Sequence, residues 1–158
     1  MKSDSLDSAI EGTFALEREP SETLVIHCAD PRFRPAFQEF VGKAIGIDRH
    51  TLISLAGGAG PFVLSDPESD LAKQMIDQLR LFIEGAGMKN VVALNHTDCK
   101  WYAKTFPDDN SHKITERQIA DLQRFARMIH NEFAEVSVRT FLAVLDDKNV
   151  RFKRIPLG

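Results

Sequence analysis

The sequence predicts an α/β fold, in which a mainly parallel central sheet carries helices on both faces. The runs at residues 23–26 and 91–94 are apolar and rich in branched side chains, as in strands buried within a parallel sheet. Between these runs, apolar residues recur at the spacing of helices that pack on a sheet. Strands that alternate with helices in this way are typical of a parallel sheet covered on both sides.

The first part of the chain is expected to hold two strands and one helix. Residues 23–26 form the first strand. Apolar residues then recur at helical spacing over 33–45, and the conformational freedom of Gly46 suits the C-terminal cap of that helix. Residues 51–55 form the second strand and lead directly into the glycines of 57–60.

A second helix is expected to begin between Ser65 and Pro67. Pro67 suits the first helical position, and Asp66 or Ser65 suits the N-cap. The core-facing side of this helix is expected to carry apolar residues three or four positions apart, namely Leu71, Met75, Leu79, Phe82 and Ala86.

The second part of the chain adds a helix and three strands. The third strand is expected at 91–94. A capping box at 115–118 marks the start of the next helix, which continues to Phe133. A long strand follows at 136–145, and a short turn connects it to a last strand at 150–155.

Composition excludes several classes of partner. The net charge of −3 gives no general attraction to nucleic acid or to anionic membranes. No apolar run approaches the roughly 20 residues needed to cross a membrane, and the first residues lack the apolar core of a signal peptide. Two cysteines do not make a disulfide framework, which favours a reducing compartment. We therefore expect a cytoplasmic protein with neither nucleic-acid nor membrane partners.

Metal-ligating side chains follow two of the expected strands. Cys28 comes directly after the run at 23–26, and His96 and Cys99 follow the run at 91–94. Ligands of open α/β sheets bind outside the carboxyl ends of the strands, so these side chains converge if the two strands are neighbours. Cysteine, histidine and cysteine with an open fourth position form a ligand set for catalytic zinc. The alternative is that both cysteines are buried as small apolar residues.

An acidic and a basic residue share the expected face of Cys28. In an extended backbone alternate side chains point the same way, so Cys28, Asp30 and Arg32 lie on one side. One interpretation is an exposed salt bridge of little energetic value. The functional interpretation is that Arg32 orients Asp30 beside the metal. Asp30 then either accepts a hydrogen bond from water at the metal or becomes a fourth ligand.

These residues resemble the motifs of the beta-class carbonic anhydrases. Cys28-Ala29-Asp30-Pro31-Arg32 is similar to the Cys-x-Asp-x-Arg motif of that family, and His96-Thr97-Asp98-Cys99 is similar to its His-x-x-Cys motif. The order of the expected elements agrees with the family from about residue 22 to residue 155. The family often has Arg-Asn-Ala-Gly after the second strand and a glycine after the second zinc cysteine. This chain has Ser54-Leu55-Ala56-Gly57 and Lys100 at those places, which alters the wall of the expected pocket.

The resemblance implies a beta-carbonic-anhydrase-like fold and one zinc ion per chain, held by Cys28, His96 and Cys99. It also implies an Asp30–Arg32 catalytic dyad, reversible hydration of carbon dioxide to bicarbonate, and a homodimer or higher homo-oligomer. Two alternatives stay open. One is a zinc hydrolase on the same fold that acts on another small molecule, such as carbonyl sulfide or carbon disulfide. The other is a zinc-binding protein without catalytic activity.

We expect two parts of the chain. Residues 1–20 form an N-terminal arm or a short helix, with the apolar residues Ile10, Phe14 and Leu16. Residues 21–158 form a single zinc-binding α/β domain. The apolar residues of the first part are too few for a core of their own, so they favour contact with another apolar surface, as in self-association.

Other polar and aromatic residues have simpler explanations. The glycines at 57–60 match no phosphate-binding pattern and are expected to form a tight turn beside the metal cleft. His27 should point away from Cys28 and serve packing or hydrogen bonding. Asp98 either lies just outside the ligands of the metal site and accepts a hydrogen bond there, or is a turn residue. Trp101 and Tyr102 either line the cleft or cover an interface. Three further histidines are expected on the surface: His50, His112 and His130.

Overall fold

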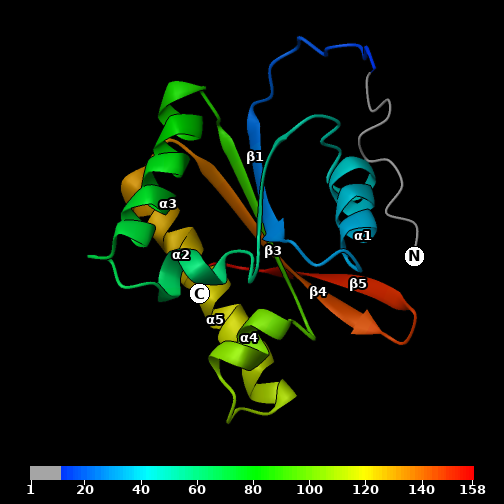
Figure 1. Cartoon of the computed structure of the whole chain (residues 1–158), viewed down its shortest axis with the longest axis vertical. Coiled ribbons are helices and arrows are strands. Elements are labelled where there is room, and N and C mark those ends of the chain that lie inside the picture. The colour runs from blue at the N-terminus through cyan, green and yellow to red at the C-terminus, as the bar shows by residue number, and fades with distance from the viewer. Residues whose placement is uncertain (1–11) are drawn as a thin grey trace, which may run out of the picture.

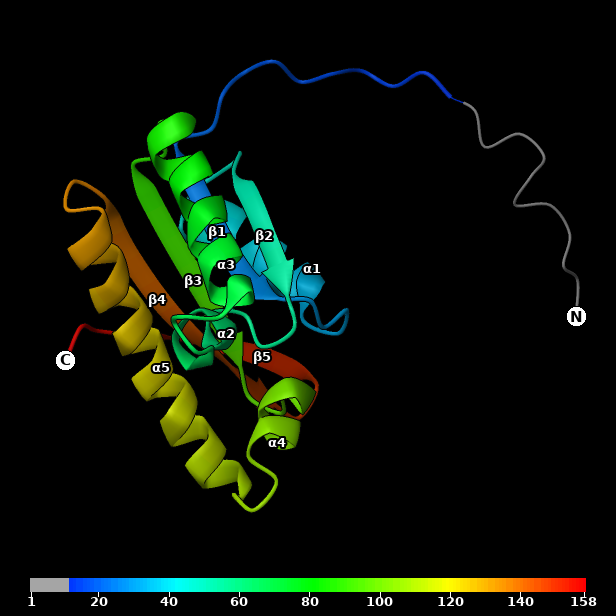
Figure 2. The ribbon, with the colours of Figure 1, turned by 60° about the vertical axis from the view of Figure 1, so that its left-hand side comes forward.

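The computed structural model describes residues 12–158, and it confirms the α/β fold class. A five-stranded sheet has the order β2-β1-β3-β4-β5, with four parallel strands and an antiparallel β5 at one edge (Figures 1 and 2). The strands are β1 (Thr23–Cys28), β2 (Thr51–Leu55), β3 (Asn90–His96), β4 (Ser137–Asp146) and β5 (Asn149–Ile155). No helix among these residues is long and apolar enough to cross a membrane.

Helices cover both faces of the sheet. In Figure 2, α3 and α5 lie in front of the strands, and α1 lies behind them. The helical segments are α1 (Arg34–Glu39) with the π-helical turn η1 (Phe40–Ala44), α2 (Gly60–Leu64), α3 (Asp70–Arg80) with the π-helical turn η2 (Leu81–Gly85), α4 (Lys100–Thr105) and α5 (Ser111–Glu132). The short helices α2 and α4 have no counterpart in the sequence prediction.

Each face of the sheet has its own apolar core, because successive strand residues point to opposite sides. Leu24 and Ile26 of β1 belong to the core under α3 and α5. Val25, between them, belongs to the core under α1, together with Phe33 and Phe37. The alternation of β1 between two cores explains why its sequence is apolar throughout.

The start predicted for the second helix, between Ser65 and Pro67, is wrong. The helix α3 begins at Asp70, and its N-cap is Ser69, whose hydroxyl accepts a hydrogen bond from the Ala72 amide at 3.1 Å. Asp66 does not cap this helix, because its carboxylate accepts a hydrogen bond from the Glu68 amide at 3.0 Å and closes a turn instead. A side chain that favours an N-cap also favours such a turn, so the residue type alone does not distinguish them.

The expected core-facing side of α3 is also wrong in part. Leu71 is 60% exposed, while the neighbouring Ala72 is buried together with Leu79 and Ile83. Only Leu79 of the five expected core residues is fully buried. Met75 and Phe82 are partly buried against the same core as Leu79, so the prediction fails at the two ends of the stripe, Leu71 and Ala86, which are exposed.

The start of α5 differs from the expected capping box. The helix begins at Ser111, one turn earlier, because Asn110 provides the N-cap and accepts a hydrogen bond from the Lys113 amide at 2.9 Å. Thr115 lies inside the helix, where its hydroxyl donates to the Ser111 carbonyl at 2.9 Å. The strands and the turn that follow agree with the prediction.

Residues 12–20 contain neither helix nor strand and extend away from the sheet domain beyond the start of β1 (Figure 2). Phe14 is 89% exposed and Leu16 is 75% exposed. Arg49 connects this segment to the domain through Glu17 at 2.8 Å and the Glu19 carbonyl at 2.6 Å. Ile10 lies outside the described residues, and the division into an arm and a zinc-binding domain stays a prediction.

Candidate metal centre

The strands β1 and β3 are parallel neighbours, as the prediction of a metal site required. In their register His27 lies beside Leu94, so both strands end at the same edge of the sheet. Cys28 is the last residue of β1 and His96 is the last residue of β3. A short turn then returns the chain to Cys99, which precedes α4. The fold therefore brings together three side chains from two distant parts of the sequence.

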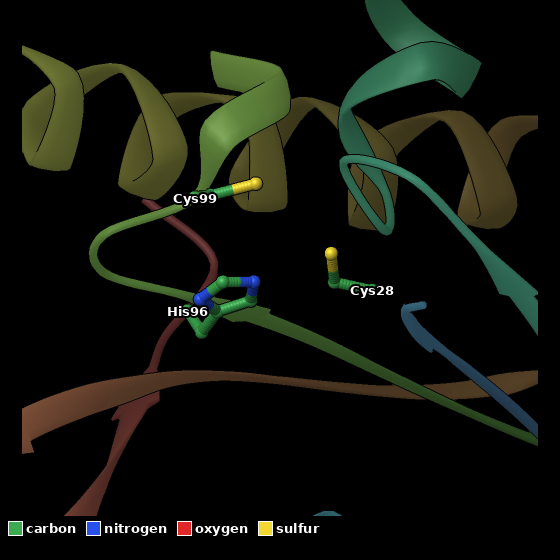
Figure 3. Close-up of side chains that lie close together, drawn as sticks. All are labelled: Cys28, His96 and Cys99. Carbon is green, nitrogen blue, oxygen red and sulfur yellow. The ribbon is translucent and has the colours of Figure 1, made fainter. Parts of the chain in front are cut away.

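The three side chains converge in the buried space shown in Figure 3. One ligand atom from each of Cys28, His96 and Cys99 can be chosen so that all lie within 4.8 Å of one another, and all three residues are buried. Tetrahedral zinc, with bonds of about 2.0–2.3 Å, places its ligand atoms about 3.5–3.8 Å apart. The group can therefore hold a metal ion of this size after small adjustments.

The orientation of His96 favours ligation through Nε2. Its Nδ1 lies 2.6 Å from the Thr97 carbonyl oxygen, which can only accept, so Nδ1 carries the proton. Nε2 then has a free lone pair, and this buried atom has no hydrogen-bond partner among the described residues. The Phe33 ring stacks on the imidazole at 4.0 Å between centroids and restricts its rotation. A buried acceptor without a partner is costly, and a metal ion would satisfy it.

The side chains of Cys28 and Cys99 shift each other's pKa in opposite directions. A hydrogen bond from Cys99 lowers the pKa of Cys28, and His96 and the backbone near Asp30 and Gly57 contribute in the same direction. The same bond, together with burial, raises the pKa of Cys99. Cys28 therefore loses its proton more readily than an ordinary cysteine, and a bound cation would favour the thiolate form of both residues.

Asp30 and Arg32 form the predicted pair beside this group. The guanidinium Nη2 donates to Asp30 Oδ2 at 2.7 Å, and Nε donates to Oδ1 at 3.1 Å. These bonds lower the pKa of Asp30, which stays ionised. Asp30 Oδ2 lies 3.9 Å from His96 Nε2, so the carboxylate borders the space between the candidate ligand atoms.

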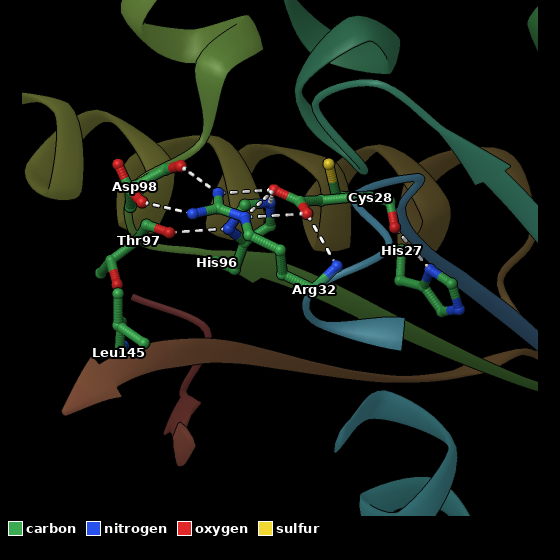
Figure 4. A network of polar contacts seen from close by, with 8 residues as sticks. His27, Cys28, Arg32, His96, Thr97, Asp98 and Leu145 are labelled. Carbon is green, nitrogen blue, oxygen red and sulfur yellow. Dashed lines mark hydrogen bonds and ion pairs between the residues drawn. The ribbon is translucent and has the colours of Figure 1, made fainter. Parts of the chain in front are cut away.

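Asp98 is both a turn residue and a second partner of Arg32. Its φ of 58° lies in the left-handed region, which lets the chain turn between His96 and Cys99. Its carboxylate accepts a hydrogen bond from Arg32 Nη1 at 2.8 Å, as Figure 4 shows. Of the two predicted roles, the structure shows the turn residue, and the carboxylate accepts from Arg32 rather than from a candidate ligand.

A buried chain of polar groups lies on the opposite side of the centre and was not expected. Asn95 Oδ1 accepts a hydrogen bond from the Ala59 amide at 3.0 Å, and its Nδ2 lies 3.4 Å from the Tyr102 hydroxyl. Tyr102 donates to Asp121 at 2.9 Å, and burial raises the pKa of Tyr102, which stays protonated. The chain connects the turn after β2 to the segments that hold His96 and Cys99. Gly58 fits this turn because a Cβ there would lie 2.5 Å from Asn95 Oδ1.

A cleft of about 350 Å³ opens beside the cysteines. Its walls include Ala29, Pro31 and Ala56, with Lys100 and Trp101 from the start of α4. A Cβ at Gly57 would lie 2.5 Å from the Trp101 ring, so the absence of a side chain lets the indole lie against the turn. The glycines thus form the expected turn, and Trp101 lines the cleft. Tyr102 is buried, so both interpretations of it were wrong.

The remaining histidines lie away from the three ligands. His27 faces the opposite side of the sheet, as predicted, where it packs against Phe37 at 4.7 Å and donates to the Cys28 carbonyl at 2.8 Å. His112 and His130 are exposed, as predicted. His50 is half-buried rather than exposed, and burial lowers its pKa. A larger hollow of about 670 Å³ between α2, α3 and α5 contains none of the candidate ligands.

Comparisons with sequences identify no function. No protein-family model matches the chain. A protein of Rickettsia bellii that is described only as uncharacterized is 25% identical over 130 residues, which cover 80% of this chain and 78% of that protein.

Comparisons with solved structures agree on the fold. The beta-carbonic anhydrase isoform I of Trichomonas vaginalis is 16% identical, with a TM-score of 0.54 and coverage of 89% of this chain and 87% of that chain. The carbonic anhydrase of Streptococcus mutans is 16% identical, with a TM-score of 0.56 and coverage of 92% of this chain and 88% of that chain. One of two tetrameric beta-carbonic anhydrases of Sordaria macrospora is 11% identical, with a TM-score of 0.57 and coverage of 87% of this chain and 82% of that chain. The chain therefore has the fold of the beta-class carbonic anhydrases.

Proposed function

We propose that this protein binds one zinc ion per chain and reversibly hydrates carbon dioxide to bicarbonate. The observation that carries the proposal is the buried convergence of Cys28, His96 and Cys99, with His96 Nε2 left without a hydrogen-bond partner in residues 12–158. Two thiolates and one imidazole leave a fourth position of a tetrahedral ion open, as catalytic zinc requires. The likeness in fold to beta-carbonic anhydrases supports this activity.

The residues around the centre have separate roles in this proposal. Bound zinc would lower the pKa of a coordinated water toward about 7 and so supply a nucleophile at neutral pH. Asp30 would accept a hydrogen bond from the attacking water and orient it toward the substrate carbon. Arg32 keeps Asp30 ionised, so that the carboxylate accepts this bond rather than donating one. The contact of Asp30 with Arg32 favours the open site over one in which Asp30 is a fourth ligand.

The cleft supports a small neutral substrate. Its mostly apolar walls suit an uncharged molecule such as carbon dioxide, and the ammonium group of Lys100 can attract the bicarbonate anion. The same walls suit carbonyl sulfide and carbon disulfide, which are also linear and uncharged. Hydrolysis of these molecules is the second candidate function, and a zinc-binding protein without catalytic activity is the third.

A stopped-flow assay of carbon dioxide hydration tests the proposal, with protein of measured zinc content. Catalysis should be seen in the parent and in His130→Ala, which changes an exposed histidine. It should be lost in His96→Ala. Release of hydrogen sulfide from carbonyl sulfide or carbon disulfide, without carbon dioxide hydration, would replace the first function by the second. Zinc-loaded protein that is inactive with all three molecules would support the non-catalytic alternative.

We also propose that the chain forms a homodimer or a higher homo-oligomer. Phe14 and Leu16 are exposed on the segment outside the sheet domain, where another copy can cover them. The tetrameric enzymes of Sordaria macrospora show that this fold assembles in other proteins. Sedimentation velocity at micromolar concentration should show an oligomer, and Phe14→Asp should shift it toward the monomer. A monomeric parent would contradict the proposal.

The cytoplasmic location stays a prediction. Cys28 and Cys99 are free thiols in the structure, and zinc thiolate sites require reduced cysteines. This requirement supports a reducing compartment for the proposed function.

A further inference from the structure

The guanidinium group of Arg32 connects the two loops that carry the proposed zinc ligands. On one side, Nε and Nη2 donate to the carboxylate of Asp30 in the loop after β1. On the other side, Nη1 donates to Asp98 Oδ2 at 2.8 Å and Nη2 donates to the Asp98 carbonyl at 3.1 Å. Asp98 belongs to the turn between His96 and Cys99, so a single side chain joins both loops (Figure 4).

We propose that Asp98 is a positioning residue, which anchors Arg32 so that Arg32 holds Asp30 at the edge of the metal site. Asp30 alone would hold the guanidinium through Nε and Nη2, so rotation about the Nε–Cζ bond, which exchanges Nη1 and Nη2, would have to break only the bond from Nη2. The bond from Nη1 to Asp98 restricts this rotation, because each of the two nitrogens then has its own acceptor. This two-sided attachment, together with the Arg32 amide that donates to Asp30 Oδ1 at 2.9 Å, keeps Asp30 3.9 Å from His96 Nε2.

The contact of Arg32 with Asp98 also affects the closed form of the site, in which Asp30 would be a fourth ligand of the metal. If Asp30 moved onto the metal, Arg32 would lose one carboxylate but keep Asp98. Arg32 would therefore not be left as an unpaired cation beside the metal ligands. The contact with Asp98 therefore lowers the cost of such a move, although the bonds from Arg32 to Asp30 would still be lost.

The backbone of Asp98 allows a test that separates the anchor from the turn. Because its φ is 58°, replacement by alanine would disturb the turn as well as the contact with Arg32. Asp98→Gly keeps the left-handed backbone and removes the carboxylate, whereas Asp98→Asn keeps both the backbone and one acceptor oxygen. Asp147, with a φ of 51° in the turn between β4 and β5, provides the control Asp147→Gly for a change of the same kind away from the site.

The first measurement is the rotation of Arg32 about Nε–Cζ in zinc-loaded, nitrogen-15-labelled protein, followed by NMR exchange between the two Nη signals. The signals are assigned by their loss in Arg32→Lys. Rotation should be slow in the parent and in Asp147→Gly, and about fivefold faster in Asp98→Gly, as expected for the loss of one exposed charged contact. Asp98→Asn should lie within about twofold of the parent.

The second measurement is carbon dioxide hydration, and this part rests on the proposed function. In Asp98→Gly kcat should fall about fivefold at unchanged zinc content, and Asp98→Asn should recover most of it. Parent-like rotation in Asp98→Gly would overturn the inference, whether or not the parent is active. Faster rotation with unchanged kcat in an active enzyme would overturn the positioning role. An inactive parent would contradict the proposed function, and the rotation would then decide whether Asp98 anchors Arg32.

Discussion

The two sides of the candidate metal centre are built from different kinds of contact. On one side, Asn95, Tyr102 and Asp121 form a buried chain of hydrogen bonds. On the other side, Arg32 joins Asp30 to Asp98 at the protein surface, where the Arg32 side chain is 48% exposed. Breaking a buried hydrogen bond costs the desolvation of the group left behind, whereas exposed ion pairs contribute little to stability. The buried side should therefore control folding, and the exposed side should control chemistry.

Gly58→Ala should give the largest loss of stability, about 2–5 kcal/mol, through crowding and backbone strain. The added Cβ would lie 2.5 Å from Asn95 Oδ1 at a φ of 57°. Gly46→Ala is the matched control, since Gly46 has a φ of 78° but no heavy atom within 4 Å of the added Cβ. Its cost should be limited to the backbone term of about 1–2 kcal/mol. Equal losses in urea unfolding, at equal zinc loading, would show that the buried side is not tightly packed.

Tyr102→Phe should cost about 1–3 kcal/mol, because Asp121 and Asn95 would lose a buried partner. The same unfolding measurement checks this value. Phe106→Leu provides a comparison, since it changes an aromatic neighbour of Tyr102 without removing a polar group. An unchanged free energy of unfolding in Tyr102→Phe would show that the hydroxyl does not stabilise the buried chain.

Asp30→Ala and Arg32→Ala should change stability by less than about 1 kcal/mol, since their pair is partly exposed. Turnover should nevertheless fall by about a hundredfold, as is usual when a group that positions a proton is removed. Zinc should stay near the parent level in both variants, which elemental analysis checks. Loss of zinc in Asp30→Ala would show instead that Asp30 is an obligatory ligand.

The smallest expected effect is the dependence of stability on acidic pH. Arg32 lowers the pKa of Asp30 in the folded protein, so their pair stabilises the fold above the ordinary pKa of aspartate, about 3.9. This contribution should be lost as the pH falls through the lower, folded pKa. The difference in unfolding free energy between metal-free parent and Arg32→Ala should therefore be present at pH 6 and shrink below about pH 4. If the difference in unfolding free energy did not change with pH, it would come from the packing of Arg32 rather than from its ion pair with Asp30.

The contrast between the two sides also explains what the sequence could predict. Cys28, His96 and Cys99 were found because their chemistry is rare and they follow strands that must end at one edge. Asp30 and Arg32 were found because they lie close to Cys28 in the sequence. The buried chain was missed because its members are far apart in the sequence, and polar residues within helices usually face solvent.

Element boundaries show a related limit. Asp66 and Thr115 both favour helix starts by residue type, yet Ser69 and Asn110 provide the actual caps. Several candidate caps competed within a few residues, and local preference could not rank them. The exposure of Leu71 was missed for another reason, since Leu71 and Ala72 are adjacent and only the packing of the folded helix selects between them.

The content of zinc per chain tests the central claim most directly. The parent, purified without added metal and measured by elemental analysis, should contain about one equivalent of zinc, as one tetrahedral site requires. Cys28→Ser should contain far less, while Ser54→Ala, a change at the edge strand β2, should contain as much as the parent. A parent with little zinc, and no difference between it and Cys28→Ser, would contradict the account.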